Sequence, residues 1–224
     1  MAAKGNGSGT AIDAPRQVID AAMELAAAGS WHGLSMDDII DASKLPRAEV
    51  QRYFLAKHEI LIALARQTDA DVLSGDLSDL ADETPRDALF DILMQRFDAL
   101  DAYKPGLKVV LGEARSRPQH ILPVLPQLGR SMAAMMTAVG IDPKTNGGPP
   151  RVAALSLIWL SVMRKWLDDD SADQAKTMAA LDKALLNAES LANSLNDGPV
   201  SFIRTLLSEL RPSRDVEKPA EPSD

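Results

Sequence analysis

The sequence of 224 residues contains no cysteine, few aromatic residues (4%) and only three histidines. Without cysteine, disulfide scaffolds, thiolate zinc sites, iron–sulfur clusters and cysteine nucleophiles are excluded. No apolar run approaches the ~18 residues that a membrane-spanning helix needs, and residues 1–13 lack the apolar segment of a signal peptide. We therefore expect a cytoplasmic protein of one or two domains.

Motifs of enzyme active sites are also missing. The three histidines, His32, His58 and His120, have no partner at metal-ligand spacing. The sequence holds neither a phosphate-binding glycine loop nor a nucleophile elbow. The acidic run 168–170 lies at a helix junction, where it predicts a helix cap rather than a metal site. The sequence therefore predicts a protein that is not an enzyme and that needs no cofactor or metal.

Apolar residues, which make up 46% of the chain, recur every three to four positions, and long stretches of strict alternation are absent. This pattern is typical of amphipathic helices and predicts an all-α fold. Residues 1–12 and 211–224 are rich in glycine, serine or proline, and we expect disordered tails there. The expected helices are 15–28, 37–42, 46–55, 57–73, 85–102, 105–114, 126–139, 151–167, 173–195 and 199–210.

The most specific pattern lies in the first sixty residues. Ser35 is placed to cap a short helix, with Asp38 as its partner in a capping box and with Leu34 against Ile39 as a hydrophobic staple. A tight turn follows, and Pro46 opens the next helix. Two short helices joined by a tight turn, with a longer helix before them, have the layout of a DNA-binding helix-turn-helix.

The second of these two short helices has one apolar and one polar face. Val50 and Phe54, four residues apart, are expected to face inward. The side chains expected on the outer face are Arg47, Glu49, Gln51 and Arg52, and Tyr53 follows them. Arginine binds guanine edges or phosphates, glutamine binds adenine, and a tyrosine hydroxyl can bind a phosphate. This face is therefore the candidate DNA-binding surface.

The stretch 34–64 resembles the N-terminal domain of TetR-family transcriptional regulators. The positions that carry the resemblance are Ser35, Asp38-Ile39-Ile40, Lys44-Leu45-Pro46, Tyr53-Phe54 and Lys57. The resemblance implies a helical C-terminal domain that binds a small ligand and dimerises through its last two long helices. It also implies that a homodimer binds double-stranded operator DNA. The DNA-binding residues expected on this basis are Ser35, Lys44, Arg47, Gln51, Arg52, Tyr53 and Lys57.

The sequence departs from the family pattern in the turn and in its charge. Lys44 replaces the turn glycine, at a cost of roughly 1 kcal/mol if the left-handed conformation is kept, so a reshaped turn is expected. Residues 44–57 carry four basic and one acidic side chains, but residues 13–70 carry six basic and nine acidic ones, and the whole chain has a net charge of −8. This balance predicts weak, salt-sensitive DNA binding. The alternative is a helical bundle that kept the fold and lost DNA binding.

Methionines gather in the second half of the chain, and methionine adapts to irregular apolar ligands. An apolar small molecule or lipid is the effector that such a pocket would bind, and plain helical core is the alternative. The expected lining residues are Met94, Phe97, Met132, Met135, Met136 and Met163.

Two long helices near the C-terminus carry apolar stripes that suit a four-helix dimer interface. Core packing within one chain is the alternative. The expected interface residues are Leu155, Trp159, Val162, Trp166, Leu181, Leu185 and Leu195.

A second resemblance concerns residues 166–182, which look like the C-terminal region of the lipid-binding accessory protein of ubiquinone biosynthesis. It implies an alternative function, the binding of a lipid or quinone precursor by a protein with a vestigial helix-turn-helix. The helix expected at Pro199–Leu210 is amphipathic but not lysine-rich, so it predicts packing onto the core, with marginal membrane contact as the alternative. The expected domains are 13–62 for DNA binding and 63–198 for ligand binding and dimerisation, followed by the terminal helix 199–210.

Overall fold

The structure is a computed structural model that describes residues 13–145 and 147–194. These residues form nine α-helices and four short 3₁₀ helices and contain no strand, which confirms the all-α prediction. The α-helices are α1 (Ala14–Ala28), α2 (Met36–Ser43), α3 (Arg47–Val50), α4 (Lys57–Leu73), α5 (Pro85–Leu100), α6 (Lys104–Ala114), α7 (Leu125–Ala138), α8 (Gly148–Leu167) and α9 (Ala175–Ser194). The 3₁₀ helices are η1 (Ser78–Asp82), η2 (Asp101–Tyr103), η3 (Pro118–His120) and η4 (Leu122–Val124).

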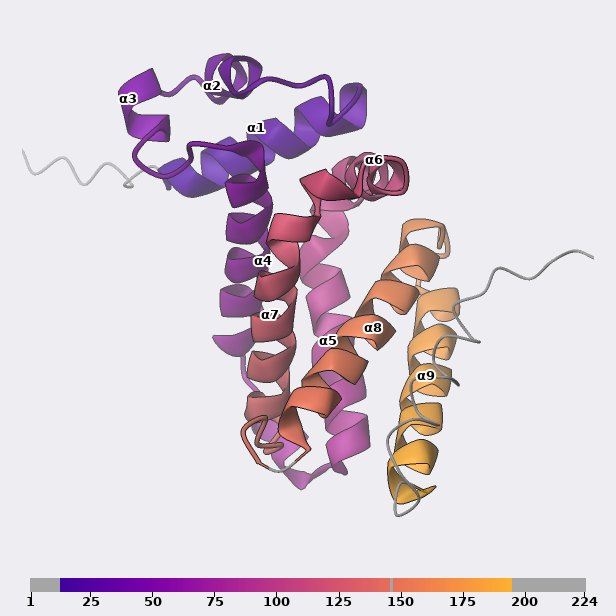
Figure 1. The fold of residues 1–224 in the computed structure, drawn as a ribbon. Coiled ribbons are helices and arrows are strands. Elements are labelled where there is room, and N and C mark those ends of the chain that lie inside the picture. Colours follow the sequence, from indigo (N-terminus) through magenta and orange to yellow (C-terminus); the bar gives the residue numbers. More distant parts are fainter. Residues whose placement is uncertain (1–12, 146, 195–224) are drawn as a thin grey trace, which may run out of the picture.

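Helices α1, α2 and α3 lie together at one end of a bundle of long helices (Figure 1). Helix α4 runs from this end along the bundle and packs against α5 and α7. Helix α8 packs against α7 and α9, and α6 lies beside α1. The nine helices expected between residues 13 and 194 are thus all present. The expected helix 199–210 and both expected tails lie outside the described residues.

Helices α1 and α6 approach each other unusually closely at Gly106. A Cβ atom at this position would lie 2.5 Å from the carbonyl oxygen of Met23, so only glycine permits the observed packing. In the preceding 3₁₀ turn, the hydroxyl of Tyr103 donates a hydrogen bond to Asp20 of α1 at 2.7 Å. Burial and this bond raise the pKa of Tyr103 to about 12. The contact fixes α1, and with it the N-terminal helices, on the rest of the chain.

A buried ion pair joins three helices inside the bundle. Nε of Arg96 in α5 donates to a carboxylate oxygen of Asp69 in α4 at 2.9 Å, and the hydroxyl of Ser131 in α7 donates to the other oxygen at 2.5 Å. The guanidinium also lies over the ring of Trp159 in α8, 4.5 Å from its centroid. Burial lowers the pKa of Arg96, and the carboxylate and the aromatic ring offset the loss of its hydration.

The stripes expected to form a subunit interface lie in the core of the single chain. Leu155, Trp159, Val162, Trp166, Leu181 and Leu185 are all buried. The ring of Trp159 stacks on Phe97 with centroids 4.1 Å apart, so this contact covers one face of its indole. Because these six side chains are buried within one chain, they cannot contact a second subunit. They match the alternative expectation, core packing within one chain. Leu195 lies outside the described residues.

The residues expected to line a ligand pocket also lie in the bundle. Phe97, Met132, Met135, Met136 and Met163 are buried members of the same apolar core, and Met94 is half-buried and packs against it. Their gathering between α5, α7 and α8 is equally what plain helical core, the alternative, predicts. Whether a ligand enters among them stays a prediction.

The acidic run at the junction of α8 and α9 contains a buried helix-capping group. The carboxylate of Asp169 accepts hydrogen bonds from the amide and hydroxyl of Thr177, both at 2.8 Å, and from the amide and hydroxyl of Ser171. Burial by itself would raise the pKa of Asp169, but these hydrogen bonds hold it well below its usual value. The junction therefore depends on a charged carboxylate.

Asp169→Asn is expected to lower the free energy of unfolding by about 2–3 kcal/mol, because donors to a buried carboxylate lose an ionised acceptor. Asp170→Asn is the matched control: Asp170 is exposed, and we expect a change within about 0.5 kcal/mol. Urea denaturation at neutral pH measures both variants.

The difference between wild type and Asp169→Asn should also depend on pH. Because the folded pKa of Asp169 lies below the unfolded one, its contribution is complete above about pH 5 and is lost as the pH falls through the aspartate range toward the folded value. A difference that persists unchanged down to pH 3 would contradict this role.

Candidate nucleic-acid interface

Helices α2 and α3 are held against α1 by apolar packing and by one long-range hydrogen bond. Ile39, Ile40 and Val50 are buried beneath them. The side-chain amide of Gln17 in α1 donates to the carbonyl oxygen of Ser43, the last residue of α2, at 2.6 Å. This bond fixes the end of α2, from which the turn begins.

The first turn of α2 has the predicted capping box. The amide of Asp38 donates to the hydroxyl of Ser35 at 3.1 Å, and the amide of Ser35 donates to the carboxylate of Asp38 at 2.8 Å. Hydrogen bonds from Ser35 lower the pKa of Asp38. The Ser35 hydroxyl also donates to this carboxylate at 2.6 Å, so contact with a phosphate would require it to change its acceptor.

The turn between α2 and α3 keeps the left-handed geometry that a glycine usually provides. Lys44 has a φ of 57° and a ψ of 17°, and its amide donates to the carbonyl oxygen of Asp41 at 3.3 Å. The expectation of a reshaped turn is therefore wrong. The packing of α2 and α3 imposes the conformation in spite of the strain that a Cβ atom brings.

Helix α3 is shorter than the expected helix 46–55. Beyond Val50, the amides of Arg52 and Tyr53 bond to carbonyls three residues earlier, so the helix continues as a tighter turn. Val50 and Phe54 are buried, as predicted. The exposed side chains on the opposite side are Arg47, Gln51, Arg52 and Tyr53, the last with 49% of its surface accessible.

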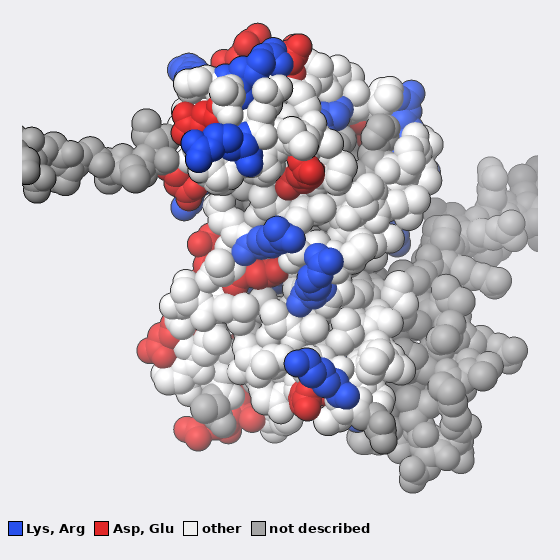
Figure 2. Space-filling model, turned by 60° about the vertical axis from the view of Figure 1, so that its left-hand side comes forward, with Lys and Arg blue, Asp and Glu red and all other residues white. Residues whose placement is uncertain are grey.

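Acidic side chains of α2 compensate part of the positive charge on α3. Arg47 forms an ion pair with Asp37 at 2.8 Å across the two helices, and the hydrogen bond that it donates to this carboxylate raises the pKa of Arg47. Figure 2 shows basic and acidic side chains next to one another at the end of the molecule that carries these helices. The sequence indicated the local charge balance but not this pairing, which depends on the angle between α2 and α3.

Lys57 has partners other than the phosphate that the family resemblance implies. Its ammonium group donates to the carbonyl oxygens of Trp31, His32 and Leu34 at 2.6, 3.3 and 2.5 Å and lies 5.3 Å from the centroid of the Trp31 ring. Burial lowers its pKa. In this arrangement the side chain points into the protein, toward the segment between α1 and α2.

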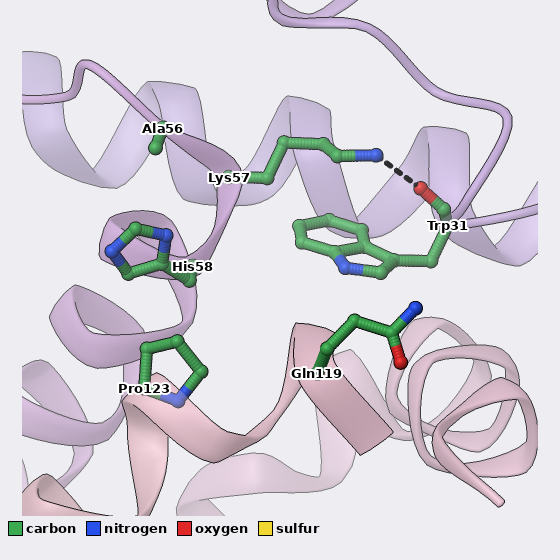
Figure 3. Close-up of a pocket in the computed structure, with 6 residues that line it drawn as sticks. All are labelled: Trp31, Ala56, Lys57, His58, Gln119 and Pro123. Atoms are coloured by element: carbon green, nitrogen blue, oxygen red, sulfur yellow. Dashed lines mark hydrogen bonds between the residues drawn. The ribbon is translucent and has the colours of Figure 1, made fainter. Parts of the chain in front are cut away.

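A hollow of about 230 Å³ lies below this lysine, between the N-terminal helices and the segment that joins α6 to α7. Figure 3 shows the indole of Trp31 above it, with Gln119 and Pro123 on the opposite side. The residues that line it are Trp31, Ala56, Lys57, His58, Gln119 and Pro123. Sequence reasoning missed this junction, because no local pattern relates residues 119 and 123 to residue 31.

The fold and the site together define a class: an all-helical protein with a helix-turn-helix unit at the end of a helical bundle. Residues 18–64 match the sequence model of the family described as "Bacterial regulatory proteins, tetR family". The helix-turn-helix is therefore of the TetR type, which confirms the resemblance seen in residues 34–64.

Solved structures share the fold of this chain. The chain is similar to the TetR transcriptional regulator from Nitrosomonas europaea ATCC 19718, with a TM-score of 0.60 and 20% identity over 78% of this chain and 97% of that one. It is also similar to a TetR transcriptional regulator from Rhodococcus sp. RHA1, with a TM-score of 0.55 and 19% identity over the same shares of the two chains. No curated protein matches the chain.

The residues of the second resemblance have local structural partners. Trp166 is buried, and Asp169 and Thr177 bond to each other at the start of α9. Among the described helices, none is long and apolar enough to cross a membrane. The lipid-carrier alternative gains no support from residues 166–182, whose hydrogen bonds are those of a helix junction, and the helix expected at 199–210 lies outside the described residues.

Lys44→Gly is expected to be more stable than Lys44→Ala by about 0.5–1 kcal/mol, because glycine adopts a positive φ without strain. The two variants lose the same charge, so their difference isolates the backbone conformation. Urea denaturation followed by circular dichroism measures it. Equal stability of the two variants would show that Lys44 is not strained.

Proposed function

We propose that this protein is a TetR-type transcriptional regulator that binds operator DNA through α3. One observation carries the proposal: polar side chains on α3 and on the turn after it are exposed. They lie on a helix-turn-helix that has both the capping box and the left-handed turn. The family match over residues 18–64 supports the same function.

On a DNA duplex, α3 would enter the major groove. Gln51 and Arg52, which are exposed, would contact base edges or phosphates, and the hydroxyl of Tyr53 would bind a phosphate. Lys44 and Arg47 would add phosphate contacts, with Arg47 leaving its ion pair with Asp37 to do so. The acidic surroundings would make binding strongly dependent on salt concentration.

A homodimer would present two copies of α3 to successive major grooves, about 34–36 Å apart. Because the apolar stripes of α8 and α9 are buried in the core, the interface would use side chains on their outer faces. Leu157 of α8 and Leu186 of α9 are 38% and 45% exposed and are the large apolar candidates there. An apolar ligand bound among the core methionines would change the spacing of the two helix-turn-helix units and release DNA.

Arg52→Ala is expected to weaken binding to the specific operator by about 1–3 kcal/mol if Arg52 contacts a base, and to relax the preference at that position. Arg130→Ala, which removes an exposed charge from α7, outside the proposed interface, is the matched control and should leave binding unchanged. Fluorescence anisotropy with the DNA upstream of the protein's own reading frame, and with a scrambled duplex, measures both variants at two salt concentrations.

Two outcomes of this titration would count against the regulator. One is equal affinity of the wild type for the upstream and scrambled duplexes at low salt. The other is an Arg52→Ala variant that binds the upstream duplex as tightly as the wild type does.

The proposed dimer predicts that the double variant Leu157→Asp, Leu186→Asp is monomeric, because each aspartate would place a charge in an apolar interface. Leu122→Asp, which changes an exposed leucine of η4, should stay dimeric. Light scattering at micromolar concentration measures the mass of each. A monomeric wild type would refute the dimer.

A further inference from the structure

We infer that Lys57 and Glu113 are positioning residues that hold the segment between α1 and α2, and that Lys57 does not contact DNA. The inference rests on the proposed function, since it concerns how the DNA-binding helices are oriented. It assigns to Glu113 a role that the sequence did not indicate, and it replaces the phosphate contact expected for Lys57. The segment in question, residues 30–34, leads directly into the cap of α2.

The ammonium group of Lys57 has three N–H donors, and the segment offers three carbonyl acceptors. Its bonds to Trp31, His32 and Leu34 leave it no free donor. The indole of Trp31 lies beneath the ammonium and is itself buried. A phosphate could bind this group only after one of these bonds had broken, so a contact with DNA would loosen the segment that precedes α2.

Glu113, at the end of α6, binds the same segment from another direction. Its carboxylate accepts a hydrogen bond from the amide of His32 at 2.7 Å, although the two residues are 81 positions apart. Burial alone would raise the pKa of Glu113, but hydrogen bonds from Ser30, His32 and Trp31 lower it. The carboxylate of Glu113 thus accepts hydrogen bonds from the amides of segment 30–34, and the carbonyl groups of the same segment accept hydrogen bonds from Lys57.

These two residues have opposite charges and belong to different parts of the fold. Lys57 begins α4, and Glu113 is in the last turn of α6, the helix that packs on α1 through Gly106. The segment 30–34 has no regular secondary structure of its own beyond a turn. Its position, and that of Ser35 after it, therefore depends on bonds to its backbone groups, which Lys57 and Glu113 provide from both sides.

Lys57→Met tests the inference in DNA binding, with Lys44→Met as the matched loss of an exposed charge. A positioning role predicts that Lys57→Met lowers the ratio of upstream to scrambled affinity at least tenfold and leaves scrambled affinity and its salt slope unchanged. Loss of a phosphate contact, expected for Lys44→Met, weakens binding to both duplexes and reduces the slope by about one. The same pattern for Lys57→Met would overturn the inference.

Hydrogen exchange provides a readout that needs no DNA. Both Lys57→Met and Glu113→Gln should speed exchange of the amides between residues 31 and 38 at least tenfold while leaving α8 unchanged. Faster exchange throughout the chain, or no change near residue 32 in either variant, would overturn the inference. If the wild type shows no preference for the upstream duplex, the proposed function fails, and the exchange experiment still decides whether these residues hold the segment.

Discussion

The close approach of α6 to α1 is the contact on which the placement of the helix-turn-helix depends. The space between Gly106 and the backbone of Met23 admits no Cβ atom. On one side of this contact Tyr103 is bonded to α1, and on the other Glu113 is bonded to the segment that follows α1. These three contacts, one from η2 and two from α6, therefore fix the orientation of α1 and of the segment that follows it. Because α2 and α3 pack on α1, the same contacts orient the exposed face of α3.

Electrostatics in this protein are arranged as local pairs rather than as a continuous basic surface. Arg47 is neutralised by Asp37 on the neighbouring helix, and the charge of Lys57 is directed toward backbone carbonyls. A net charge of −8 would oppose approach to DNA at long range. Binding by such a protein would depend on a few short-range contacts from Gln51, Arg52 and Tyr53, which favours selectivity over non-specific affinity.

Helix positions were predictable because their causes are local. The capping box at Ser35 and the proline in the first turn of α5 involve residues within three positions of each other, and both are present. The inward orientation of Val50 and Phe54 followed from their spacing. The four 3₁₀ helices were not predicted, since a single turn has too few residues to show a period. The left-handed turn at Lys44 was expected to change, but packing on both sides retained it.

The sequence by itself determined the all-α class, the order and approximate positions of the helices and the helix-turn-helix of the TetR type. These features depend on periodicity and capping over a few residues. Tertiary structure decided which apolar stripes are buried: those of α8 and α9, including Trp159, face the core of one chain. It also decided the partners of Lys57 and Glu113, because a side chain's direction depends on elements that the chain brings together across 23 to 81 positions. Hydrophobicity and charge specify that a group needs a partner, and only the packed fold specifies which one.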